Sequence, residues 1–165
     1  MILRRIAIGS SLLASLAMAG CAGEKGDGMN DDPLVGNWSN DTCYGSEMVP
    51  EGIESCSTEL NLKDDLEVEL VTEEVSLPAT EKLPGCTTTR RITGQRWSTD
   101  HATNTLTITG TGNATLERKG CVHEEDNRAA EPTGDIELRP GKMKYELRGD
   151  SLKILDGSLA GTYSR

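Results

Sequence analysis

Four cysteines in the body of the chain are the residues best placed for covalent chemistry: Cys43, Cys56, Cys86 and Cys121. A fifth, Cys21, follows an apolar amino-terminal segment. An even number of cysteines in a secreted domain predicts disulfides, here two, each stabilising the fold by about 2–4 kcal/mol. Zinc would need close ligand pairs such as Cys-x-x-Cys, and only Cys121-Val122-His123 comes near that spacing. We therefore expect two disulfides and no metal site.

Two histidines are the other candidates. His123 stands beside Glu124, Glu125 and Asp126, a grouping that could ligate a metal or supply a base, and His101 lies in a predicted turn. Catalysis would also need an oriented nucleophile or an open metal position. The chain has no Gly-x-Ser-x-Gly, His-Glu-x-x-His, phosphate-binding loop or dinucleotide fingerprint. We interpret residues 123–126 as a solvated loop and expect a binding protein without a cofactor; an enzyme of unknown type is the distant alternative.

The amino terminus has the layout of a secretion signal. Arg4 and Arg5 precede a mostly apolar segment at residues 6–17, and Met18-Ala19-Gly20 leads into Cys21. This segment is too short for a permanent membrane-spanning helix.

The cysteine at the end of this signal points to a lipid anchor, because residues 16–21, Leu-Ala-Met-Ala-Gly-Cys, resemble the lipobox of bacterial lipoproteins. The resemblance implies that residues 1–20 are a signal peptide, that Cys21 carries a diacylglyceryl thioether, and that its amino group is acylated. Ala22 in place of Asp suggests the outer membrane of a cell envelope, with the domain facing the periplasm or the exterior. Several acyl chains hold far more firmly than one. The alternative is an ordinary signal peptide with a chance cysteine.

Residues 21–33 are expected to be the lipidated cysteine and a flexible acidic tether. The twelve residues from Ala22 contain three glycines and a proline, and a coil of that length spans roughly 20 Å. A calcium loop is the competing interpretation, but the spaced ligand pattern that ends in a bidentate Glu is missing. Loss of the signal peptide leaves 15 basic against 27 acidic residues, a net charge near −12. Nucleic acid is therefore not an expected partner, since phosphate binding needs a basic face.

Residues 34–165 are expected to form one β domain. Apolar and polar residues alternate along 59–63 and 66–70, with Asp64-Asp65 as a hairpin turn. Further strands are expected at 87–97, 105–109, 114–121, 142–147, 151–155 and 158–164, with a reversal at Gly110 to Asn113 and an irregular stretch at 123–134. On such a strand Arg90 and Arg91 point to opposite faces, so they are not a joint anion clamp.

About eight to ten antiparallel strands must hide their edges, which predicts a barrel or a sandwich. Two segments favour a barrel. Gly36-Asn37-Trp38 resembles the Gly-x-Trp motif of lipocalins and bacterial lipocalin-like domains, and residues 145–154 with 161–165 are similar to their closing hairpins. The resemblance implies an up-and-down barrel whose closed end is plugged by Trp38, with Arg148 or Arg165 packed on the indole. Thr99-Asp100-His101 is a partial echo of a second lipocalin motif.

Two binding functions follow, and both leave the membrane as a partner through the anchor. One is a filled barrel whose loops contact a protein or an envelope polymer; the other is a lipocalin-like pocket for a small apolar ligand. The chain has no Phe and only five Trp and Tyr residues, and pockets are usually lined by apolar and aromatic side chains. The filled barrel is therefore favoured.

Strand order leaves the disulfide pairing open. If each strand reverses the last, Cys43, Cys56 and Cys86 lie at one end of the barrel and Cys121 at the other. A local Cys43–Cys56 bridge ranks first, yet it leaves Cys86 and Cys121 separated by roughly 25 Å of strand. Either the strand count is off by one, or the long loop brings these two cysteines together.

Overall fold

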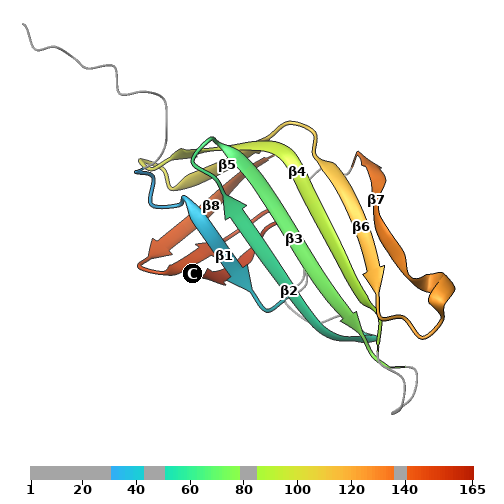
Figure 1. Ribbon diagram of the computed structural model, residues 1–165. Coiled ribbons are helices and arrows are strands. Elements are labelled where there is room, and N and C mark those ends of the chain that lie inside the picture. The colour runs from blue at the N-terminus through green and yellow to red at the C-terminus, as the bar shows by residue number, and fades with distance from the viewer. Residues whose placement is uncertain (1–30, 43–50, 79–84, 136–140) are drawn as a thin grey trace, which may run out of the picture.

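Period-two segments of the chain form one antiparallel sheet in the computed structural model, which describes residues 31–42, 51–78, 85–135 and 141–165 (Figure 1). Within these ranges the elements are β1 (Gly36–Asn40), β2 (Ile53–Leu62), β3 (Glu67–Ser76), β4 (Thr87–Asp100), β5 (Thr105–Thr109), β6 (Asn113–Lys119), the 3-10 helix η1 (Glu124–Asp126), β7 (Arg128–Asp135), β8 (Gly141–Arg148), β9 (Ser151–Ile154) and β10 (Gly161–Ser164).

Eight of these strands close into a barrel in the order β1, β2, β3, β4, β5, β8, β9 and β10. Every neighbouring pair is antiparallel, and β10 returns to β1 through one residue pair, Ser39 opposite Ser164. The predicted hairpin at Asp64-Asp65 joins β2 to β3. The all-β antiparallel barrel predicted from the alternation is confirmed.

Strands β6 and β7 lie outside the barrel and are here called the extension (Figure 1). The long β4 pairs with β3 along one edge and with two strands along the other. On that second edge its first half, Thr87–Thr93, pairs with β6 and its last five residues pair with β5. Both β5 and β6 therefore run antiparallel to β4, in the same direction as each other. The reversal expected at Gly110 to Asn113 is wrong. The chain instead continues along the same edge of β4, with the register changed by one residue between the Arg96–Thr109 and Thr93–Asn113 pairs. Gly110 has a positive φ of 90° there, and its carbonyl accepts a hydrogen bond from Gln95 Nε2 at 2.9 Å.

The irregular stretch expected at residues 123–134 is also partly wrong, since β7 occupies Arg128–Asp135. Side chains from Arg128 to Gly134 are all exposed. A strand that buries neither face needs no alternation of apolar and polar residues, so β7 has no period-two pattern.

The shared direction of β5 and β6 decides one disulfide. Lys119 lies opposite Thr87, which brings Cys121 next to Cys86, and the two form a disulfide with a Cα–Cα distance of 4.4 Å. Of the two explanations left open by the sequence, the miscounted reversal is correct. Cys56 is also disulfide-bonded. Cys43 and Cys21 lie outside the described residues, so the Cys43–Cys56 pairing and the lipidation of Cys21 stay predictions.

The core is one cluster of buried residues: Leu34, Trp38, Leu60, Leu62, Val68, Leu70, Ile92, Trp97, Leu106, Ile108, Ala114, Met143, Tyr145, Leu152, Ile154, Leu159 and Tyr163. Trp97 belongs to this core. The strand expected at 87–97 would end at this residue, but Trp97 is only 2% exposed and its Nε1 donates to Lys63 O at 2.9 Å. Because β4 continues to Asp100, Trp97 faces inward well before the turn.

Both tryptophans should therefore matter for stability. We expect Trp38→Ala and Trp97→Ala each to lower the free energy of unfolding by about 3–5 kcal/mol, since each deletes a fully packed ring. Urea unfolding followed by far-ultraviolet circular dichroism measures the change. Leu155→Ala is the matched control, because Leu155 is 46% exposed. A Trp97→Ala variant as stable as this control would contradict its place in the core.

Candidate functional site

The closed end of the barrel is built on Trp38. Trp38 and Leu34 are both fully buried, and the indole Nε1 donates to Leu34 O at 2.8 Å. The carboxylate of Asp32 accepts a hydrogen bond from the Leu34 amide at 2.8 Å, which turns the chain into β1. The segment before β1 is thereby packed across the end of the barrel.

Arg165 is the cation that packs on this tryptophan. Its guanidinium carbon lies 4.4 Å from the Trp38 ring centroid, and its Nη2 donates to Pro33 O at 2.7 Å and Val35 O at 2.8 Å. Gly36 has a φ of 144°, and a Cβ there would stand 3.3 Å from Arg165 Nε, so the approach favours glycine. Of the two arginines left open by the sequence, Arg148 lies elsewhere, bonded to Glu146.

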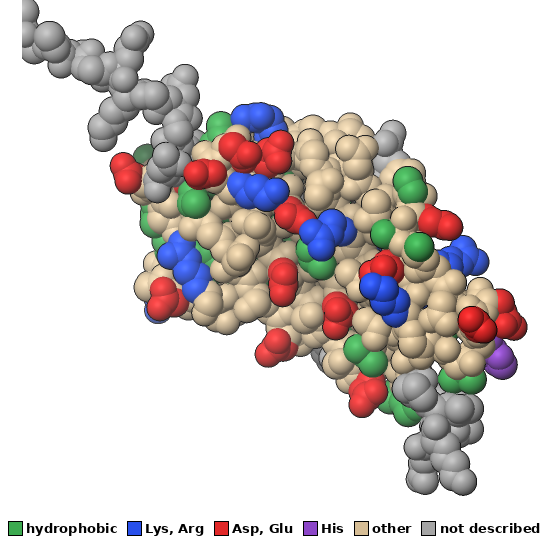
Figure 2. Space-filling view, in the orientation of Figure 1, with side chains coloured by type: hydrophobic (Ala, Val, Ile, Leu, Met, Phe, Trp, Pro, Cys, Tyr) green, Lys and Arg blue, Asp and Glu red, His purple; other side chains and the backbone are tan. Residues whose placement is uncertain are grey.

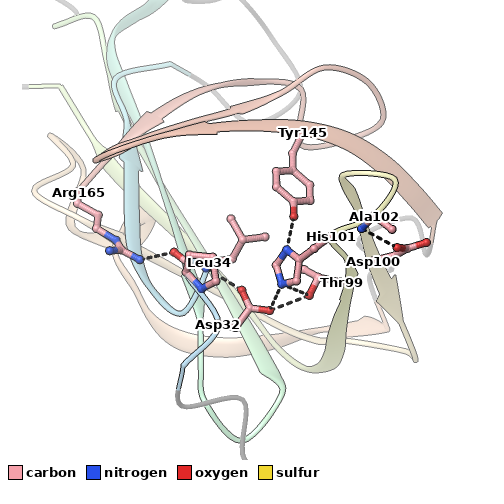
Figure 3. Close-up of polar contacts among 9 residues, drawn as sticks. Asp32, Leu34, Thr99, Asp100, His101, Ala102, Tyr145 and Arg165 are labelled. Carbon is pink, nitrogen blue, oxygen red and sulfur yellow. Dashed lines mark hydrogen bonds and ion pairs between the residues drawn. The ribbon is translucent and has the colours of Figure 1, made fainter.

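A polar network lies beside the plug and links three separate parts of the chain (Figure 3). His101, in the turn between β4 and β5, has Nδ1 2.8 Å from Tyr145 Oη on β8 and Nε2 3.0 Å from Asp32 Oδ2. Thr99 Oγ1 donates to the same Asp32 oxygen at 2.7 Å. Figure 3 shows the Tyr145 ring pointing from β8 toward the imidazole.

Burial and charge favour a structural role for this network over a catalytic one. The Asp32 side chain is 5% exposed and that of His101 is 51% exposed. Burial raises the pKa of Tyr145, and the nearby carboxylates of Asp32 and Asp100 raise it further. A phenol with a raised pKa stays protonated at neutral pH and is a poor nucleophile. A neutral imidazole satisfies both partners, accepting from Tyr145 and donating to Asp32.

The turn that carries His101 is fixed by Asp100. Thr103 Oγ1 donates to its carboxylate at 2.8 Å, and the backbone amides of Ala102 and Thr103 donate at 3.0 and 3.3 Å. The hydrogen bond from the Thr103 hydroxyl is the main cause that lowers the pKa of Asp100. Desolvation is the next-largest effect and opposes it, and the two backbone amides and the charge of Lys144 lower the pKa further. The carboxylate therefore acts as a cap for the turn.

Searches against protein-family models, curated proteins and solved structures found no match. Function is therefore inferred from the side chains of this chain alone.

A surface groove with a volume of about 490 Å³ lies where β1 and β10 diverge, lined by Asn40, Thr42, Lys153, Ile154, Leu155, Ala160, Gly161 and Thr162. In the described ranges, no three His, Cys, Asp or Glu side chains are grouped so as to hold a metal ion. The part of the chain that the structure describes contains no helix long and apolar enough to cross a membrane.

Other residues singled out in the sequence lie apart from the network. His123 is exposed and precedes η1, as the solvated-loop interpretation requires. Arg91 forms an ion pair with Glu69 on the outer face of the sheet, where acidic and basic side chains are interspersed (Figure 2). Arg90 lies opposite buried Thr72 on the inner face, so the two arginines do point apart.

Sequence reasoning missed the joint role of Asp32, His101 and Tyr145. Asp32 was assigned to the tether, His101 only to a turn, and Tyr145 to a closing hairpin. A usable signal existed: Thr99-Asp100-His101 and the residues before β1 fall at the same end of an antiparallel barrel. Nothing local in the sequence, however, shows which side chains cross that end.

Tyr145 generates a pH-dependent prediction. At neutral pH, Tyr145→Phe should cost about 1 kcal/mol by removing the hydrogen bond to His101. Because the folded pKa is raised above 10.0, the stability that Tyr145 contributes is complete below about pH 10 and is lost as pH rises through the folded value. Melting temperatures of both proteins from pH 7 to 11 should therefore converge above pH 10. A gap that stays constant over this range would contradict the assignment.

Proposed function

We propose that the protein is a lipid-anchored component of a bacterial cell envelope that acts by binding, as a filled β-barrel whose loops contact a protein or an envelope polymer. The signal segment ending at Cys21 supports the anchor and the location. The membrane is then a partner through the acyl chains, and the barrel is the part that meets another molecule.

The packed barrel interior carries the binding part of this proposal. Eleven large side chains in it are less than 2% exposed, among them both tryptophans. Ligand pockets of small-molecule carriers are typically cavities of about 300–1,000 Å³ lined by apolar groups. Here the apolar side chains pack against one another, so the proposal assigns recognition to parts of the molecule outside this packed core.

A lipocalin-like carrier of a small apolar ligand is the second candidate. The observation that favours it is Arg165 over Trp38 at the closed end, since this contact is what the resemblance of Gly36-Asn37-Trp38 implied. That contact concerns the plug of the barrel. It does not by itself create space for a ligand.

Ligand uptake separates the two functions. The chain starting at Ala22 should show no saturable binding of an apolar fluorescent probe or a fatty acid at micromolar concentration. Trp97→Ala is the matched positive control, because truncation of a buried ring leaves an apolar cavity of the kind that accepts small apolar molecules. Saturable one-to-one binding by the unaltered chain would favour the carrier.

The anchor is tested by Cys21→Ser in the full chain. A serine hydroxyl does not replace the thiol as acceptor of the diacylglyceryl group, so we expect loss of lipidation and of stable membrane association. Detergent-phase partitioning and mass determination of the amino-terminal peptide measure both. An unlipidated Cys21→Ser protein that still partitions fully with membranes would contradict the anchor.

A further inference from the structure

Three arginines share the inner face of the sheet where the extension leaves the barrel. Arg118 on β6 lies directly opposite Arg128 on β7. Arg90 on β4 lies opposite Leu116, two residue pairs along the ladder from Arg118 and so on the same face. Directly opposed residues of an antiparallel pair point to the same face, and diagonal neighbours stand roughly 7–8 Å apart. Arg90, Arg118 and Arg128 are here called the arginine face.

These three differ from the other arginines of the described chain. Arg91 and Arg148 are paired with glutamates, and Arg96 and Arg165 donate to backbone carbonyls. Among the described residues, no ion pair or hydrogen bond engages the arginine face. All the unengaged arginines of the described ranges are therefore on one face, next to each other.

This arrangement is costly without a counter-ion. Like charges placed directly opposite each other across two strands are destabilising. Two carboxylates flank the arginine face, Glu74 opposite Thr88 and Glu131 opposite Leu116, yet neither forms an ion pair with it. Arg90 and Arg118 are half-buried, so water screens them less than it screens a freely exposed side chain.

We propose that the arginine face binds one oxyanionic group, a phosphate or a carboxylate, carried by the molecule that the barrel recognises. Guanidinium groups present planar forks of N–H donors that match the oxygens of both anions. This inference rests on the proposed function and gives the chemistry of its partner.

Overall charge limits the size of that anionic partner. The mature chain has a net charge near −12, which repels a long polyanion. At physiological ionic strength the repulsion is screened beyond about 8 Å. A single anionic group on an otherwise uncharged body gains the local attraction of three arginines and avoids most of this repulsion.

Inorganic phosphate and acetate are the probes for this site, titrated into the full chain in non-ionic detergent against sodium chloride of equal ionic strength. We expect saturable heat of binding, and a rise in melting temperature beyond that in chloride, as required when a ligand binds only the folded state. Tighter binding of phosphate assigns a phosphate ester and tighter binding of acetate a carboxylate; either outcome supports the site.

Arg118→Gln and Arg128→Gln should each weaken binding by about tenfold or more, because each loses charge-assisted hydrogen bonds. Arg91→Gln is the matched control, since Arg91 neighbours Arg90 on the opposite face. In chloride alone, Arg118→Gln should melt no lower than the unaltered protein, which shows that it folds. Absence of any effect beyond chloride, or an equal loss in Arg91→Gln, overturns the proposal. The uptake of apolar probes is read separately, so the two proposals fail independently.

Discussion

Closure of the barrel depends on a single seam between its first and last strands. One residue pair joins β1 to β10, and the Ser39 hydroxyl adds a bond to Ser164 O at 3.2 Å. A barrel removes sheet edges only if this seam holds. Arg165 adds contacts to this short ladder, because its side chain stacks on Trp38 and donates hydrogen bonds to two backbone carbonyls of the segment that enters β1.

The polar network holds the segment that enters β1 against another part of the barrel end. Asp32 ties the entering segment to the β4–β5 turn through Thr99 and His101, and His101 ties that turn to Tyr145 on β8. The residues that most resemble a catalytic group in this chain are thus bonded to one another across the closed end. Their hydrogen-bonding groups are therefore used to hold the end of the barrel together.

Much of the barrel could be predicted because a strand that buries one face alternates apolar and polar residues. Residues 59–70 show this alternation clearly, and the Gly-x-Trp resemblance predicted that Trp38 closes one end of the barrel. The features that could not be predicted are those that leave no local pattern in the sequence. β7 buries neither face, and the residues around Gly110 have the composition of an ordinary glycine turn. The expected strand ended at Trp97, whereas β4 extends three residues past it, which places Trp97 within the core. The arginine face was missed for a related reason: Arg90, Arg118 and Arg128 are brought together only by the pairing of β6 with the first half of β4, which the sequence did not indicate.

The length of β4 sets the reach of the molecule. Thr99, near one end of this strand, contacts the entering segment through Asp32, whereas Thr88, near the other end, lies opposite Arg118. Eleven residues of strand separate these points, roughly 36 Å at about 3.3 Å per residue. If the amino terminus is anchored to a surface and β4 stands perpendicular to that surface, a molecule bound at the extension lies at least that far from the attachment point. The barrel would then also act as a rigid spacer, and the length of β4 would set its height.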